Sequence, residues 1–308
     1  KVVSDIYLTR TDISDKNGFK TIQLTNLKEN DYSPFFSKDG ETIYFLSSRE
    51  KGKKLWKMSI YGGEPTAVNE FKNGISNVQW KDKNTLLFTS KEGQTLHEQK
   101  LKEKKDNVIV VEDSTHWKPS RVYEFDLKNK KIKRVTTNKK PLQTYSVSPN
   151  GKWLVYSISR SYASDAQKDP FYFLQNLETN SVTQIITDRG FPSYGFSFSA
   201  DNKGFYFSSQ TASDPKWNGA GITELYYFNI ASKTYNKVPL KWEMGIGRGY
   251  QVVGNDVLVT LANKAYYKLA YYKKNENSWT KQAVKLKEKD NHTTILDVSK
   301  NGKKVVYQ

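Results

Sequence analysis

Residues 145–156 read Tyr-Ser-Val-Ser-Pro-Asn-Gly-Lys-Trp-Leu-Val-Tyr, which is an alternating apolar run, a polar turn and a second alternating run. Alternation with a period of two is typical of strands that bury one face. An Asn-Gly pair tolerates the positive backbone φ angles that tight hairpin turns require. The stretch therefore predicts a β-hairpin whose turn contains Asn150 and Gly151.

The same hairpin recurs along the chain. Further copies occur at residues 35–46, 78–88, 196–207 and 296–307, with a degenerate copy at 252–259. Successive copies lie 43, 68, 51, 54 and 46 residues apart, measured between the turn residues Asp39, Asp82, Asn150, Asp201, Asn255 and Asn301. A repeat of about 40–50 residues is typical of β-propeller blades. The long second interval predicts an insertion at about residues 93–119.

A second hairpin follows most copies, at residues 55–68, 122–136, 171–187 and 225–238. Two hairpins supply four strands, which make one propeller blade. We therefore expect an all-β fold, a β-propeller of six to seven four-stranded antiparallel blades, forming a single domain over residues 1–308.

The two ends of the sequence predict incomplete blades. Residues 1–27 read as a second hairpin without a first, and residues 292–308 read as a first hairpin without a second. The two halves could pair, which gives six blades, or belong to separate blades of a longer parent, which suggests seven. Because the chain starts with Lys1 and not Met, we expect a trimmed or processed end from which any signal peptide is gone.

Composition restricts the function classes. The net charge is +17, but the lysines are spread over turns and strand ends, which favours a solvated basic surface over a nucleic-acid site. The absence of Cys excludes disulfides, thiolate zinc sites and a Cys nucleophile. No stretch has the ~20 apolar residues of a membrane span. His97, His116 and His292 lack metal-ligand spacing, so we expect no metal and no cofactor.

The hairpin copies resemble the repeats of TolB-type periplasmic propellers and of the propeller domain of the prolyl oligopeptidase family of serine peptidases. Residues 106–136 and 145–155 are similar to the acylaminoacyl-peptidase and dipeptidyl-peptidase relatives in that family. The resemblance implies a C-terminal α/β-hydrolase domain that carries Ser, Asp and His. It implies a propeller that caps this domain and restricts access to short peptides, in a periplasmic or secreted protein, with the cytoplasm left open.

The chain itself shows no catalytic residues. A nucleophile elbow reads Gly-x-Ser-x-Gly, and the nearest strings, at residues 74–78 and 195–199, both lack the last Gly. We interpret Ser197 as a strand residue. Two functions remain, the non-catalytic propeller domain of a serine peptidase, partnered by its hydrolase domain and short peptides, or a stand-alone TolB-like protein-binding propeller. Any enzymatic activity would belong to the parent protein.

The insertion holds the candidate substrate-binding residues, Glu112, Asp113, His116 and Trp117. A carboxylate there could bind the free amino group of a peptide through a charge-assisted hydrogen bond. The alternative is a solvated loop. Two other segments are singled out. Residues 245–249, Gly-Ile-Gly-Arg-Gly, are expected to be a flexible connection, and residues 100–105 a short helix or an unstructured exposed segment.

Overall fold

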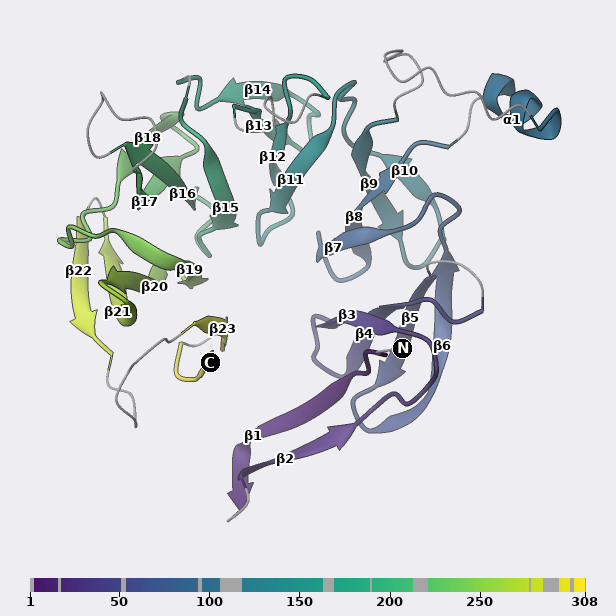
Figure 1. Ribbon diagram of the computed structural model, residues 1–308, viewed down its shortest axis with the longest axis horizontal. Helices are drawn as coiled ribbons and strands as arrows, with labels where there is room; N and C mark the ends of the chain where they lie inside the picture. Colours follow the sequence, from purple (N-terminus) through teal and green to yellow (C-terminus); the bar gives the residue numbers. More distant parts are fainter. Residues whose placement is uncertain are drawn as a thin grey trace. The chain divides into compact units, whose positions relative to one another are not determined.

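The computed structural model describes residues 3–15, 18–50, 54–93, 96–105, 118–162, 169–188, 190–212, 221–276, 278–284, 294–299 and 302–307. This part of the chain contains strands β1 to β24 and one helix, α1 (Figure 1). Every paired strand runs antiparallel to its neighbour. The chain divides into two compact units, residues 1–141 and 142–308.

The first unit contains a two-stranded sheet and two four-stranded sheets. The small sheet pairs β1 (Tyr7–Asp15) with β2 (Gly18–Gln23). The next sheet contains β3 (Asp31–Phe36), β4 (Thr42–Ser47), β5 (Lys54–Ser59) and β6 (Gly62–Glu70). The last contains β7 (Ser76–Trp80), β8 (Thr85–Lys91), β9 (Ser120–Asp126) and β10 (Ile132–Arg134), and α1 (Leu96–Glu103) lies between β8 and β9 in the chain.

The second unit contains three four-stranded sheets and a two-stranded sheet. Their strands, in chain order, are β11 (Leu142–Val147), β12 (Trp153–Ile158), β13 (Phe171–Asn176) and β14 (Val182–Ile185); β15 (Ser193–Phe198), β16 (Gly204–Ala212), β17 (Gly221–Asn229) and β18 (Thr234–Lys237); β19 (Ile246–Val253), β20 (Asp256–Asn263), β21 (Tyr266–Asn275) and β22 (Ser278–Ala283); and β23 (Ile295–Val298) with β24 (Val305–Tyr307). These repeated sheets confirm the predicted fold class, an all-β propeller.

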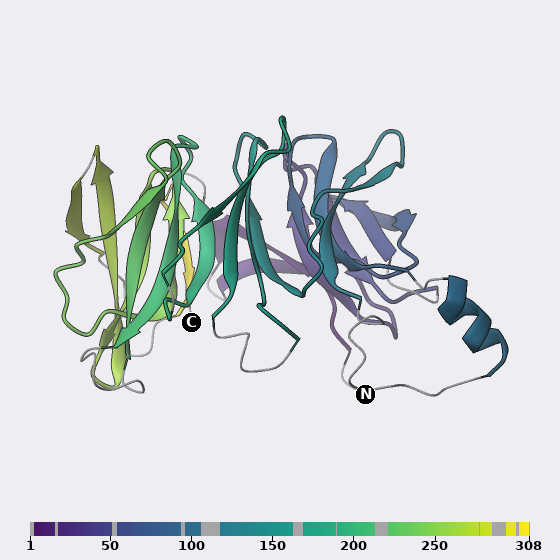
Figure 2. The ribbon, with the colours of Figure 1, turned by 90° about the horizontal axis from the view of Figure 1, so that it is seen from above.

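Aromatic side chains fill the space between sheets. In the second unit, Phe198, Phe205 and Phe228 are buried in the cluster that joins the β11–β14 and β15–β18 sheets. The Phe205 and Phe228 rings stack with their centroids 4.8 Å apart. Figure 2 shows these sheets standing face to face. The rings bury a large apolar area with few rotatable bonds, and this explains why the strands are rich in Phe and Tyr.

The turn between the first and second strands is fastened by its own side chains. In the second unit, Ser148 Oγ donates to Asn150 Oδ1 at 2.7 Å and accepts the Trp153 N–H at 2.9 Å. The Asn150 N–H also donates to Asn202 Oδ1 of the next sheet at 3.0 Å. The same Ser and Asp close the turn of the β15–β16 hairpin, where Asp201 N–H donates to Asn255 Oδ1 of the next sheet.

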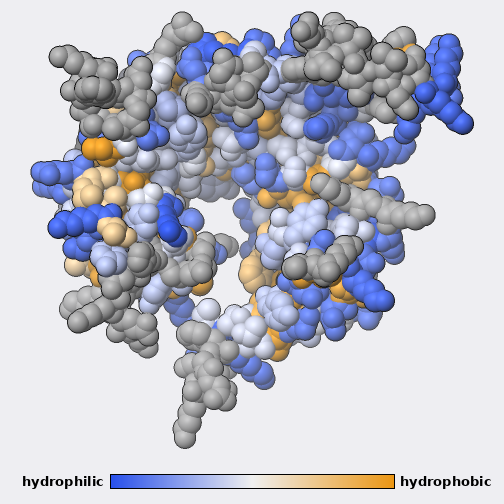
Figure 3. Space-filling view, viewed as in Figure 1, coloured by the Kyte–Doolittle hydropathy of each residue, from blue (hydrophilic) through white to orange (hydrophobic). Residues whose placement is uncertain are grey.

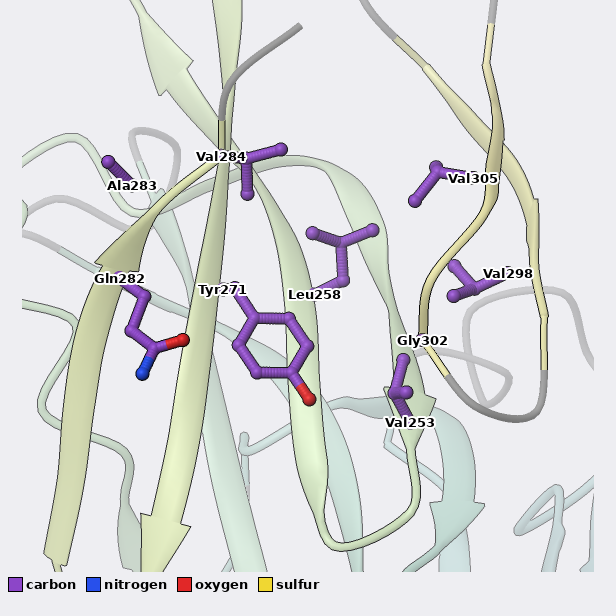
Figure 4. Close-up of a pocket in the computed structure, with 9 residues that line it drawn as sticks. All are labelled: Val253, Leu258, Tyr271, Gln282, Ala283, Val284, Val298, Gly302 and Val305. Carbon is purple, nitrogen blue, oxygen red and sulfur yellow. The ribbon is translucent and has the colours of Figure 1, made fainter.

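The β23–β24 hairpin lies beside the β19–β22 sheet. Val253 and Leu258 of that sheet form an apolar cluster with Val298 and Val305 of the hairpin. A cavity of about 340 Å³ remains at this contact (Figure 4). Its walls are the aliphatic side chains of the cluster together with Tyr271 and Gln282, so it is a gap in packing between a complete and a two-stranded sheet.

Candidate functional site

In three of the five described four-stranded sheets, the two ends differ clearly in the length of their connections. Short turns join the first and second strands, for example residues 148–152 and 199–203. At the opposite end, the second and third strands are joined by residues 92–119, 159–170 and 213–220 in three of the sheets. Long loops on a rigid scaffold are common carriers of binding residues. The end with these longer connections is therefore the candidate functional end of the blades.

A second regularity concerns the first strand of each described sheet from β3 onward. Each of these strands has a shifted register against the second strand, a β-bulge or irregularity that interrupts regular pairing. The shifts fall at Tyr32/Phe35, Ser76/Gln79, Leu142/Thr144, Tyr194/Ser197, Ile246/Gly249 and Ile295/Asp297. Bulges twist a strand and re-aim its side chains, and they are common next to binding sites.

In the second unit, these first strands lie next to one another. Strands β11 and β15, β15 and β19, and β19 and β23 are in contact, and the outer strands β14, β18 and β22 lie on the opposite side of the unit (Figure 1). We call this row of neighbouring first strands the inner wall of the second unit.

The start of β19 is the most constrained part of this wall. A Cβ atom at Gly247 would lie 2.1 Å from Cδ1 of Tyr267, and one at Gly245 would lie 2.3 Å from the Thr223 carbonyl oxygen. Gly249 has φ +113°, a conformation that other residues rarely adopt. The expectation of a flexible connection at residues 245–249 is wrong, because Ile246 to Val253 form a paired strand and each glycine meets a specific steric demand.

These glycines hold Arg248 between them. Its guanidinium carbon lies 5.0 Å from the centroid of the Tyr267 ring, within the range of cation–π attraction. Its Nη1 donates to Thr294 Oγ1 at 3.0 Å, and the side chain is exposed. The ring and the hydroxyl thus orient the charged group of an exposed side chain.

Arg248 differs from the other arginines that the structure describes. Each of the others has a carboxylate within 4.0 Å, in the pairs Arg10–Asp12, Arg49–Asp31, Arg121–Glu92, Arg134–Glu92 and Arg160–Asp169. Among the described residues, no carboxylate pairs with Arg248. A guanidinium presents five N–H donors that match a carboxylate in two-point geometry, so Arg248 has an unused capacity to bind an anion.

A tyrosine connects Arg248 with the neighbouring first strand. The Tyr250 hydroxyl donates a hydrogen bond to the Gly195 carbonyl oxygen of β15. Burial raises the pKa of Tyr250 well above its ordinary value, so this hydroxyl stays protonated and remains a donor. Tyr194, next to Gly195 in the register shift of β15, is 51% exposed. The inner wall thus presents an exposed aromatic ring and an exposed cation on adjoining strands.

The site residues predicted from sequence have a different standing. Glu112, Asp113, His116 and Trp117 lie outside the described residues. The two strings nearest to a nucleophile elbow lead into strands, with Ser76 in β7 and Ser197 in β15. The Ser76 hydroxyl lies 2.8 Å from Thr89 Oγ1, a partner that is not a general base. Ser197 is a strand residue, as predicted from the sequence.

The described part of the chain contains neither a candidate metal site nor a helix that could span a membrane. It holds no cluster of three or more His, Asp and Glu side chains suited to a metal ion. Its helix is too short and too polar to cross a bilayer. The face seen in Figure 3 is largely hydrophilic with scattered apolar groups, which agrees with lysines distributed over a solvated surface.

Comparisons with known proteins place this geometry among β-propellers. No family model matches the chain. A curated relative, "Uncharacterized peptidase YuxL" of Bacillus subtilis, is 25% identical over 178 residues, which are 53% of this chain and 27% of that protein. The chain thus matches well under a third of this relative's length.

Two solved structures illustrate the structural likeness. Acylaminoacyl peptidase of Pyrococcus horikoshii matches with a TM-score of 0.61 and 14% identity, over 95% of this chain and 43% of that chain. TolB from Acinetobacter baumannii matches with a TM-score of 0.50 and 14% identity, over 91% of this chain and 59% of that chain. The resemblance to prolyl-oligopeptidase-family propellers is therefore confirmed at the level of the fold, and the chain is a β-propeller similar to those of acylaminoacyl peptidase and TolB.

Proposed function

We propose that this chain is the non-catalytic propeller domain of a serine peptidase of the prolyl oligopeptidase family. In this role it caps the active site of a hydrolase domain and restricts access to short peptides. The observation that carries the proposal is the match of nearly the whole chain, 95%, to less than half, 43%, of an acylaminoacyl peptidase. The 25% sequence identity over 178 residues with the Bacillus subtilis protein described as an uncharacterized peptidase supports the same assignment.

The physical basis of the cap is rigidity. Buried aromatic clusters join successive sheets within each unit, and hydrogen bonds between turns, such as Asn150 to Asn202, fasten neighbouring sheets. A stiff wall of strands excludes bulky chains because widening it would break many contacts at once. A capped cavity also excludes water from the reacting groups.

We propose a periplasmic or secreted location for the parent protein.

A second function is favoured by one observation. TolB matches over 91% of this chain, and this chain corresponds to 59% of that protein, a larger share than for the acylaminoacyl peptidase. The alternative is therefore a stand-alone propeller that binds a protein partner. In that case the parent would hydrolyse no peptide.

The deciding experiment starts from the complete gene. The peptidase proposal expects a reading frame beyond codon 308 with Gly-x-Ser-x-Gly followed by Asp and His. The product of that frame should hydrolyse a short peptide anilide, and an Ala variant of the downstream serine should not. A frame that ends soon after codon 308 would exclude the peptidase proposal and favour the TolB-like alternative.

The chain itself supplies the matched control. Purified residues 1–308 should hydrolyse neither peptide nor ester substrates, since no nucleophile elbow is present in the sequence. The complete protein should also cleave a short peptide much faster than the same sequence placed inside a long peptide. Equal cleavage of the two would argue against a restricting cap.

A further inference from the structure

We propose that Arg248 is a binding residue for a carboxylate of the peptide that reaches the inner wall of the second unit. This inference rests on the proposed function, since it names the chemical group of the peptide that the propeller recognises. The first argument is electrostatic. Among the described residues, Arg248 is the arginine without a carboxylate partner. An exposed guanidinium that is held in place by a ring and a hydroxyl attracts a carboxylate in preference to a neutral amide.

The backbone around Arg248 is also sterically constrained. Gly247 and Gly249 lie inside β19 on either side of Arg248, and the lack of a Cβ atom at Gly247 lets the Tyr267 ring approach the backbone and the Arg248 guanidinium. Glycine in a strand interior weakens the strand, because it costs conformational entropy and contributes no packing. The two glycines on either side of one exposed arginine inside β19 therefore cost stability without filling a core. A role in presenting Arg248 explains this cost.

The N–H donors of the Arg248 guanidinium are arranged to fit a carboxylate. Thr294 occupies Nη1, and the Tyr267 ring covers one face of the guanidinium. In the described part of the chain, Nε and Nη2 have no hydrogen-bond partner. These two donors lie along one edge of the planar group and match the two oxygens of a carboxylate. Tyr194 is half exposed on β15, the strand that contacts β19.

The ligand class that fits is a short peptide with a carboxylate next to an apolar side chain. The carboxylate can come from the peptide's C-terminus or from an Asp or Glu side chain. Both sources have the same planar two-oxygen group, so the geometry of Arg248 accepts either. The experiment below separates them.

The test uses the 308-residue chain and three probes, followed by NMR or calorimetric titration. The probes are N-acetyl-Gly-Gly-Phe with a free C-terminus, the same peptide as its C-terminal amide, and N-acetyl-Asp-Gly-Phe-amide. We expect the free-acid peptide to bind about tenfold or more tightly than the amide, the scale of one charge-assisted contact. Arg248→Gln should reduce the affinity for the acid to that for the amide and leave the amide unchanged.

Two further variants sharpen the result. Arg134→Gln removes another exposed arginine, one that is already paired with Glu92, and should change no affinity. Arg248→Lys keeps the charge but loses the planar fork, and should retain only part of the preference for the acid. Circular dichroism and thermal unfolding confirm that each variant is folded, which is expected for exposed positions.

Each outcome decides something. If the free-acid peptide binds more tightly than both amide peptides, Arg248 recognises the C-terminal carboxylate. If the Asp peptide binds as tightly as the free acid, Arg248 accepts a carboxylate from either source. Equal binding of acid and amide, or an unchanged preference in Arg248→Gln, overturns the role of Arg248 and leaves the peptidase proposal standing. Binding of none of the probes overturns both the role of Arg248 and peptide recognition by this chain, whereas the activity of the complete protein is judged separately.

Discussion

Two arginines, Arg49 in the first unit and Arg248 in the second, use aromatic rings in the same way but have opposite surroundings. The Arg49 guanidinium lies 5.3 Å from the Phe45 ring centroid and 5.1 Å from that of Trp56. It forms a buried ion pair with Asp31, and its Nε also donates to Ser47 Oγ at 3.1 Å. Among the described residues, exposed Arg248 contacts one ring, that of Tyr267, and one hydroxyl, that of Thr294.

The difference follows from burial. The side chain of Asp31 is fully buried and that of Arg49 is 9% exposed, so each charge needs the other. An exposed guanidinium is hydrated and needs no partner, so Arg248 can keep its donors open at little cost. The comparison teaches that stacking on a ring does not identify a functional arginine. The proposal for Arg248 rests instead on its exposure and on the absence of a carboxylate partner among the residues that the structure describes.

The largest expected effect concerns the buried pair. Arg49→Gln leaves Asp31 as an unpaired buried charge and should lower the free energy of unfolding by about 3–5 kcal/mol. Urea denaturation followed by circular dichroism measures this change. The double variant Asp31→Leu/Arg49→Leu serves as the control, because removing both charges should recover most of the loss. A loss below about 1 kcal/mol in Arg49→Gln would mean that the pair is not structural.

The next effect concerns the backbone that presents Arg248. Gly247→Ala places a Cβ atom 2.1 Å from Cδ1 of Tyr267, so the ring must move. Overpacking of this kind should cost about 1–3 kcal/mol in unfolding free energy. The matched control is the same substitution in a Tyr267→Ala background, where the ring is gone and the cost should largely disappear. Full additivity of the two substitutions would contradict the contact.

A near-zero effect is expected for Arg248 itself. Arg248→Gln removes an exposed charge with one hydrogen bond to Thr294, so the unfolding free energy should change by at most about 0.5 kcal/mol. The same urea titration as for Arg49→Gln gives a direct comparison. A loss close to that of Arg49→Gln would make Arg248 a structural residue and remove the contrast between the two.

The last prediction concerns a small, pH-dependent change in Tm that arises from Asp39, in the turn between β3 and β4. The Ser37 hydroxyl and the Glu41 N–H hold the pKa of Asp39 below its ordinary value. A carboxylate with a lowered folded-state pKa stabilises the fold above its unfolded pKa of about 3.9, and this contribution is lost as pH falls through the folded pKa. Asp39→Asn should therefore lower Tm slightly at neutral pH.

The pH series checks the sign of that prediction. The difference in Tm between the natural chain and Asp39→Asn should shrink as pH falls from about 4 through the lower folded-state pKa, because the carboxyl is protonated first in the unfolded chain and then in the folded one. Thermal unfolding at neutral and acidic pH measures it. A difference that grows towards acid would contradict the assigned direction of the pKa.

Much of the fold was accessible from sequence because its signals are local. The turn at residues 148–152 is closed by Ser148 and Asn150, which lie within a few residues of the groups they bind. The aromatic run Phe205, Tyr206 and Phe207 indicated a strand, and both faces of β16 are buried there, in two different clusters. The register shifts of the first strands were not predicted, because pairing with a partner strand decides where an extra residue is placed.

The site was much less accessible. The Gly-x-Gly-Arg-Gly pattern around Arg248 was visible, but it was interpreted as a flexible connection. Its meaning depends on Tyr267, Thr294 and the lack of a nearby carboxylate among the described residues. A glycine on each side of an arginine at the start of a predicted strand was the available signal. The insertion residues Glu112 and Asp113 remain a prediction.

The sequence by itself determined the class of this protein. Period-two alternation, turn residues and a repeat of fixed length specify strands, hairpins and blades, because each depends on neighbours along the chain. Only the tertiary structure decided which arginine is paired and which is open. Arg248 meets Thr294 across 46 residues and Tyr250 meets Gly195 across 55, and contacts over such separations exist only once the sheets have packed.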